Sequence, residues 1–284
     1  MLNETTSRRA FLLMAGAALP LVAQRSFPGP LGLQLYSLRR EAAKDLPGTL
    51  SMIRKMGFEE LEVGDFFGRT PGEFRRIAAD AGLKITSVGA EWPQLTKSAS
   101  EAADNARTVG AEYVCCTNIP HHRPFAADDA RRAAENFNRW GQVLSGAGLR
   151  FCYHPHGFEF GSGPDGTLFD TMAKQIDPRN ANFEMDVFWI VFGSQDPVKL
   201  LQRYPGRFAL MHLKDMRKGE VKTGNPGDVA EEDSVPLGTG EIDWPGVLRA
   251  ARESGVRRYY IEEEHPNAVG QIPRSLEYLR KLKF

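Results

Sequence analysis

The 284 residues of this chain are 42% hydrophobic and 25% charged, a composition typical of a globular protein with a large core. Lysine plus arginine equals aspartate plus glutamate, at 36 each, so the chain has no excess positive charge for nucleic acid and we expect no such partner. The three cysteines, Cys115, Cys116 and Cys152, lie in apolar runs, and their odd number and spacing disfavour a disulfide framework or a zinc ribbon.

The first 26 residues have the pattern of an export signal. The paired arginines Arg8 and Arg9 precede an apolar run that is too short to span a membrane comfortably, an order typical of a twin-arginine signal peptide. We therefore expect residues 1–26 to be read by the twin-arginine translocation machinery and residues 27–284 to form the folded domain. The protein is then periplasmic or otherwise exported, and a retained signal anchor is the alternative.

From residue 31 onward, short apolar runs alternate with helix-like segments. The runs begin near Leu31, Glu60, Ile85, Tyr113, Leu149, Ala181, Phe208 and Arg258. Five of them follow a glycine such as Gly57, which suits the left-handed residue after a helix, and residues 70–73 (Thr-Pro-Gly-Glu) are typical of a helix-starting capping box. Eight strand–helix units predict an α/β fold, a single (β/α)8 TIM barrel with an eight-stranded parallel sheet. An open doubly wound sheet is the alternative, but no glycine-rich phosphate loop follows a strand.

Polar side chains follow the ends of most predicted strands. The fifth run ends in His154-Pro155-His156, whose two imidazoles leave the same face of the strand as Cys152. The other ends carry Gln34, Tyr36, Ser37, Glu62, Trp92, Glu184, Asp186, His212, Lys214, Asp215 and the run Glu262-Glu263-Glu264. Strand alternation lets only one parity of that last run face the barrel. Histidine and carboxylate ligands from neighbouring strands suit Mn²⁺, Co²⁺, Fe²⁺ or Zn²⁺ better than Ca²⁺.

These motifs resemble the xylose isomerase-like TIM-barrel superfamily of sugar isomerases and epimerases. The segments that carry the resemblance are 33–39, 153–160, 185–189, 212–215 and 237–244. It implies a metal with ligands from strands five to eight: Asp186, His212 and Glu263 match the last three, with Glu262 as the fallback. His154 takes the place of the usual glutamate, and the sequence does not separate it from His156. Mn²⁺ is the cofactor we expect first, with Co²⁺, Mg²⁺, Zn²⁺ and Fe²⁺ as alternatives.

The resemblance also implies an isomerase or epimerase that acts through a metal-stabilised enediolate on a non-phosphorylated sugar or keto-sugar. Glu263 and His156 are the predicted proton carriers, and Lys214 is predicted to stabilise an oxyanion or to donate a proton. The predicted substrate contacts are Gln34, Tyr36, Glu62, Trp92 and Trp189. Because histidine replaces the usual glutamate, a lyase or dehydratase on a keto-inositol or 3-keto-glycoside is the first alternative. A non-catalytic sugar-binding barrel is the second, and the sequence leaves a homo-oligomer open.

Overall fold

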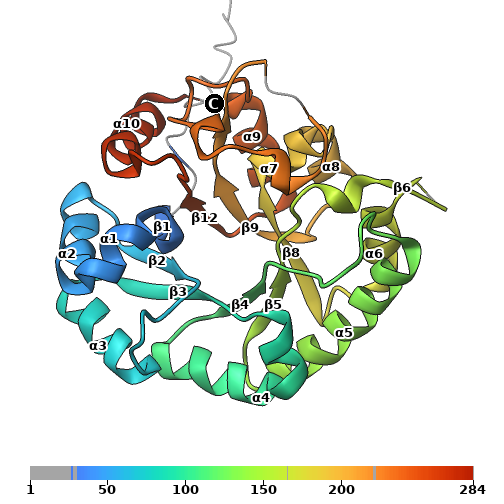
Figure 1. Ribbon diagram of the computed structural model, residues 1–284, viewed down its shortest axis with the longest axis horizontal. Coiled ribbons are helices and arrows are strands. Elements are labelled where there is room, and N and C mark those ends of the chain that lie inside the picture. Colours follow the sequence, from blue (N-terminus) through green and yellow to red (C-terminus); the bar gives the residue numbers. More distant parts are fainter. Residues whose placement is uncertain (1–26, 28–30, 165, 220–221, 284) are drawn as a thin grey trace, which may run out of the picture.

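Eight parallel strands close into a barrel in the computed structural model, which describes residues 27, 31–164, 166–219 and 222–283 (Figure 1). Around the barrel the strands run in the order β1 (Leu31–Gln34), β12 (Arg258–Ile261), β9 (Phe208–Leu213), β8 (Ala181–Asp186), β5 (Arg150–Tyr153), β4 (Tyr113–Cys116), β3 (Lys84–Gly89) and β2 (Glu60–Val63). The TIM barrel is therefore confirmed, and each strand begins within one residue of its predicted start. The predicted signal peptide, residues 1–26, lies outside the described residues.

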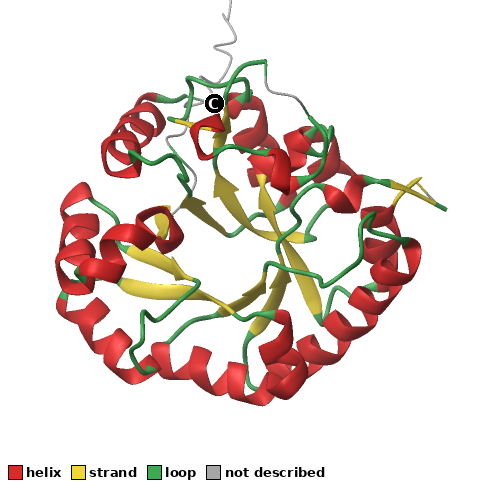
Figure 2. Ribbon diagram, in the orientation of Figure 1, coloured by secondary structure: helices red, strands yellow, loops and turns green. Residues whose placement is uncertain are grey.

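Helices surround the barrel, as Figure 2 shows. They are α1 (Arg39–Lys44), α2 (Leu46–Met56), α3 (Pro71–Asp80), α4 (Trp92–Val109), α5 (Ala127–Gly146), α6 (Leu168–Gln175), α7 (Val187–Phe192), α8 (Pro197–Arg203), α9 (Trp244–Ser254) and α10 (Ala268–Lys281). The predicted capping box is present at Thr70, and Gly57 ends α2 with a φ of 106°. Among the described residues, no helix is both long and apolar enough to cross a membrane.

The strands separate an inner from an outer layer of core. Cys115, Cys152, Leu210 and Tyr260 pack together inside the barrel, whereas Tyr153 packs outward against the helices. The three cysteines are buried free thiols, as the sequence predicts. The alternation along β5 thus directs Cys152, and His154 two residues later, toward the barrel axis.

The long loop after β9 is fastened by a single carboxylate. Asp215, in the short strand β10 (Asp215–Met216), accepts hydrogen bonds from the N–H groups of Gly238 at 2.8 Å, Gly240 at 3.1 Å and Ile242 at 3.3 Å. The same carboxylate accepts from the indole nitrogen of Trp244 at 3.0 Å, where α9 begins. The loop between β9 and α9 therefore returns to its own starting point. Its short strand β11 (Ser234–Val235) pairs with β10. A second short hairpin, β6 (Ser162–Gly163) and β7 (Gly166–Thr167), lies before α6.

Candidate metal centre and adjoining cavity

The carboxyl ends of neighbouring strands bring ionisable side chains to one level of the barrel. Asp186, at the end of β8, pairs in register with His212 of β9, which pairs with Tyr260 of β12. Tyr260 lies inside the barrel, so Glu262, two residues later, faces the same way. Glu184 shares its face of β8 with Asp186 for the same reason. These acidic and histidine side chains are all buried.

His154 and Asp186 present ligand atoms with no partner. The Nδ1 atom of His154 lies 3.0 Å from Oε2 of Glu184, so its Nε2 atom is directed elsewhere. This Nε2 lies 3.8 Å from Oδ2 of Asp186, and neither atom has a hydrogen-bond partner in the described part of the chain. The other oxygen of Asp186 caps α7 by accepting from the N–H of Phe188 at 2.8 Å. Two buried ligand atoms therefore face each other.

His212 lies among carboxylates on both sides. Its Nε2 atom is 2.8 Å from Oε1 of Glu62, an oxygen that also accepts from the side-chain amide of Gln34 at 2.6 Å. Its Nδ1 atom is 2.8 Å from Oε2 of Glu262 and 3.8 Å from Oδ2 of Asp186. The predicted substrate residues Gln34 and Glu62 thus support His212 from the side opposite to Asp186 and Glu262.

Burial and the closeness of several carboxylates shift the pKa values of the groups in this cluster. Burial raises the pKa of Glu62 to about 7 and that of Asp186 to about 8. Burial lowers the pKa of His154 to about 3, so this imidazole is neutral. For His212 burial alone would lower the pKa, but neighbouring carboxylates, Glu184 foremost, raise it well above its usual range. The neighbouring carboxylates thus favour a positive charge at the position of His212.

The donor set fits a divalent cation. Ligand atoms of His154, Glu184 and His212 lie within 4.8 Å of one another, and so do those of Asp186, His212 and Glu262. Imidazole nitrogens and carboxylate oxygens are the ligands that such ions take in proteins, and a bound cation would take the place of the proton on His212. A buried polar atom without a partner costs stability, and a cation would satisfy several at once. This buried cluster could therefore hold a divalent metal ion.

A cavity of about 600 Å³ adjoins the cluster. Among its lining residues are three members of the cluster, His154, His212 and Glu262, and the side chains Gln34, Tyr36, Arg39, Glu91, Thr117, His156, Trp189 and Glu264. The predicted substrate residues Gln34, Tyr36 and Trp189 therefore all line this cavity. This volume is ordinary for a small-molecule site.

Two groups on the cavity wall can carry protons. The ring of His156 stacks on that of His154, with centroids 4.5 Å apart, and burial lowers the pKa of His156 well below its usual value. The neutral ring keeps a nitrogen lone pair free to take a proton, and its low pKa makes the protonated form a strong acid that gives the proton back. Glu264 accepts a hydrogen bond of 2.6 Å from Lys214, whose ammonium lies 4.8 Å from the ring centre of Trp189. Lys214, the predicted proton donor, is therefore bonded to a residue that lines the cavity, Glu264.

Two predicted residues lie away from this arrangement. Glu263 has the parity opposite to Glu262, and its carboxylate accepts from the N–H of His265 at 3.1 Å instead of joining the cluster. The structure therefore brings the fallback residue Glu262 to His212. Trp92 opens α4, and its ring packs against Trp140 of α5, with centroids 4.7 Å apart. It does not line the cavity.

Two residues of the arrangement were absent from the predicted site. Glu184 precedes Asp186 by two residues, and this spacing on one strand was the available signal. Glu264 follows the last strand by three residues, outside the regular alternation, so no sequence pattern indicates its contact with Lys214.

Comparisons with known proteins agree with this geometry. The model of the family described as "Xylose isomerase-like TIM barrel" matches residues 50–282. An inosose dehydratase of Lacticaseibacillus casei is 24% identical over 254 residues, 80% of this chain and 84% of that protein. The structure of a sugar phosphate isomerase/epimerase from Parabacteroides distasonis ATCC 8503 is 28% identical, with a TM-score of 0.74 and coverage of 89% of this chain and 94% of that one. The IOLI protein with a bound zinc atom shares the fold at 14% identity, with a TM-score of 0.70 and coverage of 88% and 96%. The chain belongs to the xylose isomerase-like TIM barrel family.

Proposed function

We propose that this protein is a divalent-metal-dependent enzyme that isomerises or epimerises a sugar or keto-sugar through an enediolate. The observation that carries the proposal is the pair of unpartnered ligand atoms on His154 and Asp186, beside His212 and Glu262 and next to a cavity with two proton carriers. A purely structural cluster would gain nothing from leaving those buried atoms unpaired.

Four atoms are the proposed ligands: Nε2 of His154, Oδ2 of Asp186, Nδ1 of His212 and Oε2 of Glu262. Glu184 then holds the remaining nitrogen of His154, as carboxylates commonly do for a metal-binding histidine. Mn²⁺ is the first candidate because the set mixes nitrogen with oxygen, and Co²⁺, Mg²⁺, Zn²⁺ and Fe²⁺ follow. Such a cation, when bound, supplies Lewis acidity that makes the C–H beside a substrate carbonyl easier to ionise.

The chain's own residues then move the proton. His156 is neutral and lines the cavity, so it is the proposed base. Glu264 with Lys214 is the proposed partner that returns a proton or stabilises negative charge on the substrate. The ring of Trp189 lies against both His156 and Lys214 and gives this part of the cavity an apolar surface.

We also propose a non-phosphorylated substrate and an exported protein. Among the described residues that line the cavity beside the cluster, the one arginine is Arg39, and its guanidinium pairs with Glu231 at 2.6 Å. Phosphate sites usually offer unpaired guanidinium groups or backbone N–H groups. The export proposal depends on the paired arginines Arg8 and Arg9.

Elimination is the second candidate reaction. The similarity to inosose dehydratases over 80% of the chain favours it. So does the pairing of one neutral base, His156, with one acidic pair, Lys214 and Glu264, because loss of water needs a base and a proton donor. A keto-inositol or a 3-keto-glycoside would be the substrate. A non-catalytic barrel that binds a sugar is the third alternative, and the experiment below distinguishes all three.

The test is proton nuclear magnetic resonance of keto-sugars and keto-inositols in D₂O with Mn²⁺-loaded protein, followed by removal of the metal for recording. Deuterium beside the carbonyl with a rearranged sugar supports isomerisation, whereas new vinyl proton resonances of an enone support elimination. Asp186→Ala and His212→Ala are expected to lose stoichiometric metal, measured by elemental analysis, together with exchange. Full metal content in both variants would refute the ligand assignment, and absent exchange with intact binding would leave a binding protein.

A further inference from the structure

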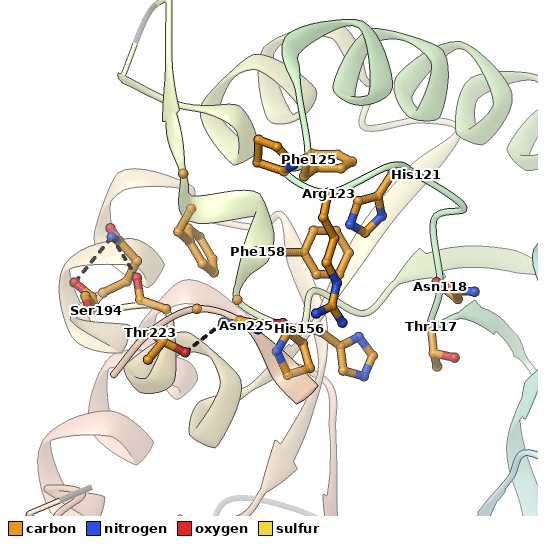
Figure 3. A pocket seen from close by; sticks show the side chains of 18 residues that line it. Thr117, Asn118, His121, Arg123, Phe125, His156, Phe158, Ser194, Thr223 and Asn225 are labelled. Atoms are coloured by element: carbon orange, nitrogen blue, oxygen red, sulfur yellow. Dashed lines mark hydrogen bonds between the residues drawn. The ribbon is translucent and has the colours of Figure 1, made fainter. Parts of the chain in front are cut away.

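A second cavity, of about 990 Å³, meets the first at Thr117 and His156, which line both. Figure 3 shows this cavity between the loop after β4, the turn after β5 and the loop after β9. The first cavity alone is already as large as an ordinary small-molecule site requires. The second space therefore exceeds what a single reacting sugar ring needs.

Aromatic rings form one side of this second cavity. The ring of Phe158 lies 4.5 Å from that of His121 and 5.1 Å from that of Phe125. Aromatic faces attract the C–H faces of sugars and the edges of other rings. Rings of this kind beside a polar site favour a flat, ring-shaped ligand.

Two polar side chains of the cavity lack a hydrogen-bond partner among the described residues. Arg123 and Asn118 both line it, and neither side chain makes a hydrogen bond or ion pair in the part of the chain that the structure describes. Figure 3 shows the guanidinium of Arg123 extending past the ring of Phe158 toward His156. Guanidinium and amide groups are multiple hydrogen-bond donors, and the amide also accepts, which suits the hydroxyl groups of a carbohydrate.

The opposite wall is a close backbone junction of three loops. A Cβ atom on Gly193 would lie 3.1 Å from the Cα of Gly157, and one on Gly224 would lie 3.2 Å from the carbonyl oxygen of Gly157. The N–H of Gly224 also donates to the carbonyl of Phe192 at 3.2 Å. Glycine is required for such approaches, and the resulting wall is built from directly packed main chain.

From these features we propose that the second cavity binds the second unit of a glycoside while the reacting sugar occupies the first. This proposal rests on the proposed function, because it assumes that the reacting sugar lies at the cluster. The shared chemistry of the second unit is a ring joined through oxygen, either another sugar or an aryl group. The linking oxygen then lies at the junction formed by Thr117 and His156.

Binding of non-reacting probes tests the proposal on the Mn²⁺-loaded full chain. The probes are methyl β-glucoside, phenyl β-glucoside, cellobiose and glucose 6-phosphate, titrated by calorimetry. We expect phenyl glucoside and cellobiose to bind about tenfold more tightly than methyl glucoside, which corresponds to ~1.4 kcal/mol. Phe158→Ala should remove the preference for the phenyl group and Arg123→Ala that for cellobiose, with methyl glucoside unchanged in both.

Arg131→Ala is the matched control, because Arg131 lies on α5, pairs with Asp128 and does not line the cavity. Arg123 is exposed, so its variant should fold even if Phe158→Ala does not. Equal affinity of wild-type protein for all three glycosides would overturn the proposal, as would an Arg123 effect confined to glucose 6-phosphate. Proton exchange on a methyl 3-keto-glucoside is measured separately. If exchange is absent while phenyl glucoside and cellobiose still bind more tightly than methyl glucoside, the proposed reaction is refuted and the proposed subsite is retained.

Discussion

Glu159 is a fully buried carboxylate behind the turn that carries His156. It accepts hydrogen bonds from the hydroxyl of Tyr153 and from the N–H groups of Gly157 at 2.9 Å and His156 at 3.1 Å. Burial nevertheless raises the pKa of Glu159 to about 7, because the loss of hydration outweighs these donors. We predict that Glu159→Gln alters the pH dependence of stability more than the stability itself.

The sign and size follow from proton linkage. The carboxyl pKa rises from about 4.5 in the unfolded chain to about 7 in the folded one, so the folded state binds the proton more tightly. The resulting stabilisation is present below pH 4.5 and is lost as the pH rises through 7. At 1.36 kcal/mol per pH unit, the loss is about 3 kcal/mol. Glutamine does not titrate, so the variant lacks this change, and at pH 8 it should equal or exceed the wild type in stability.

Urea denaturation at pH 5 and pH 8 measures the free energy of unfolding for both proteins. Other titrating groups are common to both proteins, so the difference between the two isolates Glu159. Glu135→Gln on the exposed side of α5 is the control, and its effect should stay within about 0.5 kcal/mol at either pH. A wild-type-minus-variant difference that is the same at both pH values would refute the reasoning.

Three further results are expected. Glu262→Ala should lose stoichiometric Mn²⁺ in elemental analysis, while Glu263→Ala should keep it. The reason is that the carboxylate of Glu262 contacts His212, whereas that of Glu263 contacts the N–H of His265. The opposite outcome would restore Glu263 as the ligand. His156→Gln should keep the metal but slow deuterium incorporation by about 10²–10⁴-fold, the usual contribution of a general base; an unchanged rate would rule out that role. Replacing Arg8 and Arg9 together by lysine should retain the protein in the cytoplasm, followed by fractionation and blotting, and continued export would contradict a twin-arginine signal.

The barrel was predictable because its signals are local. A glycine such as Gly57 or Gly255 follows five of the helical segments and marks where the next strand begins, and both of these glycines have the positive φ that the pattern predicts. The capping box at Thr70 depends on residues three positions apart. Such features need no knowledge of distant parts of the chain, so the sequence contains them in full.

The positions of the proposed ligands were harder to predict because they depend on contacts between strands. The choice between Glu262 and Glu263 depends on which face of β12 is inward, and the pairing of Tyr260 with His212 decides it. No local pattern contains that register. Trp92 presents the same difficulty, because its ring packs on α5, an element far along the chain. Its position after a strand end gave no indication of this outward direction.

The attachment of the loop after β9 to Asp215 has a consequence for how this barrel can diversify. Asp215 bonds the far end of the loop, and Met216 pairs with Ser234. The two ends of the segment 217–233 are therefore held by contacts that lie outside it. Lengthening a flexible loop with fixed ends costs little additional free energy. Thr223 and Asn225, which line the second cavity, belong to this segment. The sequence of this part of the cavity rim can therefore change without disturbing the strands that hold His212 and Asp186.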